Sequence, residues 1–199
     1  MDLVLIRHPA PAIDAGVCYG RRDVPLAGDA PAAADALFVR LAATDAPLPQ
    51  ALWTSPLMRC ASVAALLARR FAISRTVDAR LQEMDFGAWE GVRWDAIDRA
   101  ELDAWAADLH RARVHGGESV AQCAARVGEW LGAWRASCEA SAVSCTHVVT
   151  HAGVMRIVAS LTLGVPLEVL LSWPLEMGAL VWLRRESASR AWRLVRWNG

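Results

Sequence analysis

Short apolar runs alternate with longer amphipathic stretches along the chain, and this alternation predicts strands connected by helices. The predicted strands cover residues 2–6, 51–54, 73–77, 146–150, 179–183 and 192–197, and a polar turn joins the last two. Strands that alternate with helices favour a mainly parallel sheet covered on both faces, which is a three-layer α/β/α sandwich. The 199 residues contain no internal repeat and no linker, so we expect a single domain over residues 1–199.

Five stretches have the spacing of apolar residues that is typical of helices. They cover residues 29–43, 55–70, 93–113, 119–138 and 152–163. The second begins with Ser55 and Pro56, which suit the N-cap and the first helical position. The fourth begins with a capping box at Ser119, and Gly164 ends the fifth. Residues 81–91 have no periodicity, and we expect a loop there.

The charge of the chain is balanced, and the type of basic residue is unusual. There are 21 basic and 21 acidic side chains, so the basic excess of a nucleic-acid-binding protein is missing. The sequence contains no Lys, which excludes the lysine of a P-loop, of a Schiff base and of a kinase. We therefore expect any bound phosphate to be held by Arg, His and backbone N–H groups.

The cysteines and histidines do not form a metal-binding or disulfide pattern. The five cysteines are Cys18, Cys60, Cys123, Cys138 and Cys145, an odd number with no C-x-x-C pair. His147 and His151 have the i, i+4 spacing of helical metal ligands, but the run between them has the pattern of a strand. We expect no metal and no cofactor.

The longest apolar stretch, residues 157–183, is interrupted by Pro166 and Glu168, so we interpret it as core and not as a membrane span. The first predicted strand begins at residue 2, which leaves no room for a signal peptide. We expect a cytoplasmic protein without membrane contact. The sequence leaves a homodimer open.

Two histidines directly follow predicted strands. His8 comes after the first strand and its neighbour Arg7, and His151 comes after the strand at 146–150. In open α/β sheets, ligands bind at the carboxyl ends of the strands. If the two strands are neighbours, both imidazoles and the Arg7 guanidinium meet at one anion-sized site, which would suit phosphate chemistry. The alternative for each histidine is a hydrogen-bonded structural role.

An arginine and a carboxylate are further candidates. Arg59 lies one turn into the second helix, where its guanidinium can face the same anion; a solvated arginine is the alternative. Glu83 lies among apolar residues of the 81–91 loop, where a carboxyl can give a proton to a leaving oxygen. Asp85 and Glu90 are the alternatives for that role.

Six segments resemble, in the same order, the motifs of the histidine phosphatase superfamily, which has the phosphoglycerate-mutase-like fold. They are residues 7–8, 18–26, 54–61, 81–91, 116–119 together with 126–127, and 149–154. The resemblance extends over residues 3–165. Six matches in order are much more specific than any one of them.

The resemblance implies a role for each candidate. His8 becomes the nucleophile that forms a phosphohistidine, and Glu83 becomes the proton donor. The transferring phosphoryl group is then surrounded by Arg7, Arg59 and His151. We expect a small phosphorylated metabolite to be contacted by Arg7, Arg59, Tyr19, Gly20, Arg21 and Ala152.

The resemblance favours a phosphatase, but some positions depart from the family pattern, and Ala27, Ala30 and Ala33 are three of them. Pro9 replaces a glycine, and Asp14 replaces an asparagine that contacts phosphate in many members. The segment between Gly91 and Gly117 is shorter than in the mutases of the family, which favours hydrolysis. The compact chain is similar to the α-ribazole phosphatase branch, which acts in cobalamin biosynthesis.

Three alternatives are kept. One is a phosphoglycerate mutase-type phosphoryl transfer. Another is a catalytically idle module that binds a phosphorylated partner, although the retained acid speaks against it. A serine or cysteine hydrolase is a weaker alternative, because the chain has no G-x-S-x-G motif.

Overall fold

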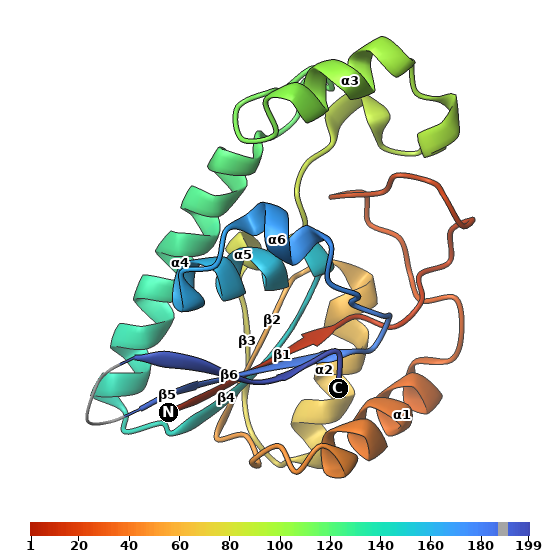
Figure 1. Ribbon diagram of the computed structural model, residues 1–199. Coiled ribbons are helices and arrows are strands. Elements are labelled where there is room, and N and C mark those ends of the chain that lie inside the picture. The colour runs from red at the N-terminus through yellow and green to blue at the C-terminus, as the bar shows by residue number, and fades with distance from the viewer. Residues whose placement is uncertain (187–190) are drawn as a thin grey trace.

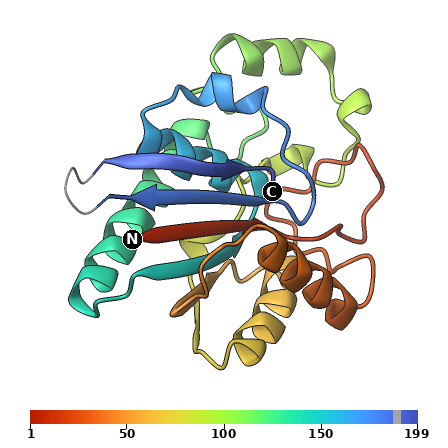
Figure 2. The same cartoon turned by 60° about the horizontal axis from the view of Figure 1, so that its bottom comes forward.

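A six-stranded sheet forms the centre of the molecule, in the strand order β3-β2-β4-β1-β5-β6. The computed structural model describes residues 1–186 and 191–199. The strands are β1 (Asp2–Arg7), β2 (Ala51–Thr54), β3 (Arg75–Val77), β4 (Cys145–Thr150), β5 (Leu180–Arg185) and β6 (Trp192–Trp197). Strands β3, β2, β4 and β1 run parallel to one another. Strand β5 pairs antiparallel with both β1 and β6. Figure 2 shows β1 between β4 and β5.

Helices cover both faces of this sheet, which confirms the predicted three-layer α/β/α fold (Figure 1). The helices are α1 (Ala30–Ala43), α2 (Met58–Arg70), α3 (Arg99–Ala107), α4 (Val120–Ala140), α5 (Ala152–Leu163) and α6 (Leu167–Leu171). One face is covered by α1 and α2, and the other by α4 and α5. Helix α3 lies farther from the sheet, beyond α6 (Figures 1 and 2). Within the described residues, no helix combines the length and the apolar character that a membrane crossing requires.

The alternating side chains of β1 fill both cores. Leu3 and Leu5 pack against α4 and α5, whereas Val4 and Ile6 pack against α1 and α2. All four are fully buried. Each such side chain contributes roughly 1.5–3 kcal/mol through removal of apolar surface from water. This burial fixes β1, and therefore the residue that follows it, in the middle of the sheet.

The register of β1 against β4 brings the two candidate histidines together. The two strands are parallel, and Arg7 lies opposite Thr150. The next residue of each chain segment is a histidine, so His8 and His151 leave the sheet at the same edge. The two strands that precede the histidines are therefore neighbours, as a shared site requires.

The start of α2 differs from the sequence prediction. Helix α2 begins at Met58, with Leu57 in the N-cap position, and Ser55 is not its N-cap. The backbone N–H of Met58 donates instead to the Asp23 carboxylate, at 2.7 Å. This cap comes from a residue 35 positions away, and the Ser55 hydroxyl accepts the backbone N–H of Leu57, at 3.3 Å, before the helix begins.

Residues 93–113 are less helical than predicted. They form a 3-10 turn at Trp94–Ala96 and the short helix α3. Asp98 caps α3, and Asp108 after its end accepts the N–H of Arg111 at 3.2 Å, so local aspartate hydrogen bonds divide the stretch. A further 3-10 turn, Ala79–Leu81, ends where the 81–91 region begins, and another, Gly87–Trp89, lies within it.

Other local signals are confirmed or need small corrections. The capping box at Ser119 and the left-handed Gly164 after α5 are present. Strand β3 begins at Arg75, two residues later than predicted, and α6 lies within the stretch that we interpreted only as core. Residues 187–190 of the predicted polar turn lie outside the described residues.

The buried His147 of β4 is expected to make the free energy of unfolding depend on pH. Its Nε2 donates to the Pro47 carbonyl at 3.0 Å, and burial lowers its pKa to about 4. The unfolded chain takes up a proton near pH 6.5 and the folded chain does not, so stability is lost as pH falls from 6.5 toward 4.

We expect His147→Gln, which keeps an N–H donor but does not titrate, to flatten this loss by about 1.4 kcal/mol per pH unit. Urea unfolding of both proteins at several pH values between 7 and 4 measures the slopes. Identical slopes would show that His147 does not take part in the acid sensitivity.

Candidate active site

His8 is held in the tautomer that a nucleophile needs. Its Nδ1 lies 2.7 Å from the Pro9 carbonyl oxygen, which only accepts hydrogen bonds, so Nδ1 carries the proton of the neutral ring. The lone pair is therefore on Nε2. Burial lowers the pKa of His8 to about 3, and the charges of Arg59 and Arg7 act in the same direction. His8 is consequently neutral at physiological pH.

His151 lies beside His8 at the edge of the sheet. The ring centroids are 5.2 Å apart and the planes are inclined by 63°. His151 is fully buried, and burial together with the nearby Arg59 and His8 lowers its pKa well below the usual range. Its Nε2 lies 2.9 Å from the Ser55 hydroxyl, which precedes α2, and 3.5 Å from the Cys60 sulfur.

Two arginines, the half-buried Arg7 and the buried Arg59, stand next to the histidines without a carboxylate partner. Arg59 is fully buried and donates to the carbonyls of Gly20 at 2.6 Å and Arg22 at 2.8 Å. Arg7 donates to the carbonyl of Leu175. The Nε atoms of both arginines are buried without a hydrogen-bond partner, and neither takes part in an ion pair among the described residues. Two uncompensated guanidinium groups make this a site for an anion.

Glu83 is positioned by the first turn of α5. Its Oε2 accepts the backbone N–H of Gly153 at 3.1 Å, and its Oε1 accepts that of Met84 at 3.1 Å. A Cβ atom on residue 153 would lie 2.4 Å from Oε1, closer than any real contact. Glycine at position 153 is therefore what allows the carboxylate to approach the helix, two residues after His151.

The loop that carries Glu83 is fixed from two sides. Arg126 of α4 donates to the carbonyls of Arg80 at 2.7 Å and Gln82 at 2.9 Å, and its Nη2 lies 2.7 Å from the Glu118 carboxylate. The Thr150 hydroxyl donates to the Leu81 carbonyl at 2.8 Å. The sequence placed Arg126 and the segment 116–119 only in a motif, and their contact with this loop is visible only in the structure.

The structure separates Glu83 from the two alternative carboxylates. Glu90 accepts the backbone N–H groups of Arg21 at 2.7 Å and Phe86 at 3.1 Å, and Asp85 accepts that of Gly87 at 2.8 Å. Both carboxylates stabilise loop conformations, whereas Glu83 reaches the helix that follows His151.

The remaining predicted substrate contacts are only partly brought to the histidines. The Tyr19 ring lies 6.2 Å from that of His8 and 5.0 Å from the Arg59 guanidinium. Gly20 contributes the carbonyl that Arg59 binds. The Arg21 guanidinium forms an ion pair with the Glu118 carboxylate at 3.1 Å, so it is already engaged by an acidic side chain.

Ala152, the last of the predicted contacts, is the half-buried first residue of α5. The exposed Asp14 lies in the 9–28 loop, and its carbonyl accepts the N–H of Val17 at 3.2 Å. Among the residues that the structure describes, no group of three His, Cys, Asp or Glu side chains is arranged as metal ligands.

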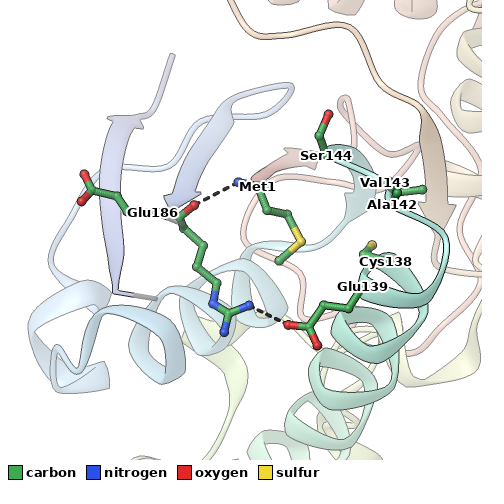
Figure 3. A pocket seen from close by; sticks show the side chains of 8 residues that line it. Met1, Cys138, Glu139, Ala142, Val143, Ser144 and Glu186 are labelled. Carbon is green, nitrogen blue, oxygen red and sulfur yellow. Dashed lines mark hydrogen bonds and ion pairs between the residues drawn. The ribbon is translucent and has the colours of Figure 1, made fainter. Parts of the chain in front are cut away.

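A hollow of about 500 Å³ lies at the opposite end of the sheet (Figure 3). It is lined by Met1 at the start of β1 and by Glu139 and Arg185, which form an ion pair at 2.8 Å. None of the candidate site residues reaches it, so its size does not identify the functional site.

The chain belongs to the histidine phosphatase superfamily (branch 1), whose family model matches residues 3–199. It is 28% identical to a glucosyl-3-phosphoglycerate phosphatase of Mycolicibacterium vanbaalenii, over 98% of this chain and 93% of the relative.

Solved structures are similar over the whole chain. A mycobacterial glucosyl-3-phosphoglycerate phosphatase superposes with a TM-score of 0.80 at 26% identity, covering 100% of this chain and 98% of that one. The α-ribazole phosphatase of Shigella flexneri gives a TM-score of 0.83 at 22% identity, over 100% and 96% of the two chains, and this shows the shared fold.

The unpaired arginines predict that inorganic phosphate stabilises the protein. At 100 times its Kd, a ligand that binds only the folded state raises the unfolding free energy by about 2.7 kcal/mol. We expect Arg59→Gln, which keeps an N–H donor but no charge, to weaken phosphate binding about 10- to 100-fold. Thermal unfolding across a phosphate titration measures this.

The control is Arg99→Gln, which removes an exposed arginine of α3. An equal phosphate effect in all three proteins would mean that the anion binds elsewhere.

Proposed function

We propose that the protein hydrolyses phosphomonoesters of small metabolites through a phosphohistidine intermediate on His8. The observation that carries the proposal is the neutral His8 ring, whose centroid lies 5.2 Å from that of His151, beside the buried Arg59 and the half-buried Arg7, which have no carboxylate partners. Phosphoryl transfer needs positioning and neutralisation of charge, and this arrangement supplies both.

In the first step, the Nε2 lone pair of His8 forms a bond to phosphorus while the bond from phosphorus to the alcohol oxygen breaks. Arg7, Arg59 and His151 stabilise the charge on the non-bridging oxygens. The carboxyl group of Glu83 gives its proton to the leaving oxygen, so the product is a neutral alcohol.

In the second step, a water molecule attacks the phosphohistidine. The Glu83 carboxylate takes one proton from the water as the new P–O bond forms, and the bond from nitrogen to phosphorus breaks. Inorganic phosphate leaves, and both His8 and Glu83 return to their starting states. The pKa of His8, lowered to about 3, keeps its leaving ring neutral.

Two substrates deserve the first comparison. We infer α-ribazole 5′-phosphate from the sequence resemblance, which would place the protein in cobalamin biosynthesis. The relative with 28% identity carries the name glucosyl-3-phosphoglycerate phosphatase, which supports that ester as the second candidate. The ranking of kcat/KM over both esters and 3-phosphoglycerate tests the choice. Equilibration of phosphoglycerates without release of phosphate would identify a mutase instead.

The roles of His8 and Glu83 make distinct predictions. We expect His8→Ala to abolish turnover. We also expect that mass spectrometry after a rapid alkaline quench detects phosphorylated protein in the wild type and none in this variant. Glu83→Gln should lose about 100-fold or more in kcat/KM on alkyl phosphates, whose poor leaving groups need a proton, and much less on p-nitrophenyl phosphate.

Equal losses of Glu83→Gln on good and poor leaving groups would contradict its role as the acid. Binding of phosphate without turnover of any ester, and without phosphorylation of His8, would favour the idle binding module.

A methyl group at position 153 tests how Glu83 is positioned. We expect Gly153→Ala to fold, because the flexible Glu83 side chain can move, but to lose about tenfold or more in kcat on alkyl phosphates as the acid is displaced. The matched control is Gly132→Ala in α4, where an added Cβ meets no atom within 4 Å. If both variants keep full activity, the contact between Glu83 and Gly153 is not needed.

A further inference from the structure

A pocket with mostly apolar walls and a volume of about 220 Å³ lies beside Glu83. It is bounded by the loop that carries Glu83 and by α3, α4, α5 and α6. Its walls include Phe86, Trp105, Leu109, Ile157, Leu167 and Leu171. Glu83 and Arg156 also line the pocket, but almost none of its surface is polar. Apart from Glu83, none of these residues takes part in the steps proposed above.

The pocket adjoins the residues that position the proposed proton donor. Glu83 and Gly153 line it, and they are the pair whose contact positions the proton donor. An acid protonates the leaving oxygen only from hydrogen-bond distance. The alcohol part of a bound ester therefore lies on the Glu83 side of the phosphorus atom, where this pocket begins.

The walls select the chemistry of that alcohol. An apolar cavity of about 150 Å³ is enough to take up benzene, and this pocket is larger. Water in it would find few hydrogen-bond partners, so an apolar group that displaces this water gains affinity.

The aromatic walls add a second preference. The rings of Phe86 and Trp105 line the pocket, and aromatic rings pack favourably against one another in offset or edge-to-face arrangements. We propose that this pocket binds a flat aromatic group in the alcohol part of the substrate. The proposal rests on the phosphomonoesterase function proposed above.

Two exposed leucines provide a matched test. Leu171 lines the pocket and is 49% exposed, whereas Leu161 of α5 is 50% exposed and lies outside it. A glutamate at either position is compatible with folding, because half of each side chain already contacts water. Only Leu171→Glu places a charge at the wall of the pocket.

The measured quantity is the ratio of kcat/KM for 2-naphthyl phosphate to that for phenyl phosphate, two esters with similar leaving groups and different ring size. We expect a ratio of about ten or more in the wild type, from the apolar area that the second ring buries. Leu171→Glu should lower the ratio about tenfold, and Leu161→Glu should keep the wild-type value. An unchanged ratio in Leu171→Glu would overturn the proposal.

Direct binding separates failure of the pocket from failure of the proposed function. Calorimetry with 2-naphthol, which carries no phosphate, measures the pocket without any reaction. Binding that is present in the wild type and in His8→Ala, but weakened about tenfold in Leu171→Glu, supports the pocket even if no ester is hydrolysed. Turnover of esters without a difference in 2-naphthol binding between Leu171→Glu and Leu161→Glu overturns the pocket and leaves the proposed function standing.

Discussion

The parallel pairing of β1 with β4 is the constraint on which the site depends. Arg7 lies opposite Thr150, so His8 and His151 leave the sheet side by side. A shift of one residue would reverse which face each side chain of β1 occupies, and would move its fully buried apolar residues into the wrong core. The same strand end also fixes the loop of Glu83, because the Thr150 hydroxyl donates to the Leu81 carbonyl. The burial of the sheet thus determines the geometry of the site.

Arg7 and Arg59 affect the site in two ways. Their charges help to keep His8 unprotonated, which preserves the lone pair of Nε2. The same charges attract the phosphate anion that this lone pair would attack. The arrangement has a cost in the unliganded protein, because buried cations without carboxylate partners and buried neutral histidines oppose folding. An anion between the guanidinium groups removes part of that cost, so stability and ligand binding are linked at this site.

Local signals in the sequence were enough for most of the fold, and distant contacts account for what they missed. The apolar periodicity and capping box of α4 and the glycine after α5 are local, and each was predicted correctly. The N-terminal cap of α2 was not, because it comes from Asp23, 35 residues away. In the site, the order of the motifs along the chain indicated His8 and His151 as candidates. The strand register confirmed that these two residues lie side by side. The choice among the three carboxylates of the 81–91 loop depended on which backbone N–H groups each accepts, and no pattern of residue types encodes that.

The two ends of the proposed substrate are bound by different parts of the fold. The phosphate end lies at the edge of the sheet, where β1 and β4 and the start of α2 determine the positions of the histidines and arginines. The proposed site of the alcohol end is the pocket between the Glu83 loop and α3, α4, α5 and α6. Glu83 lies between these two parts. The backbone N–H of Gly153 binds its carboxylate, and Arg126 binds the loop that carries it. A substitution in a wall residue such as Leu171 can therefore change which alcohol is accepted without moving the atoms that surround phosphorus. This separation allows one phosphoryl-transfer arrangement to serve esters of different alcohols.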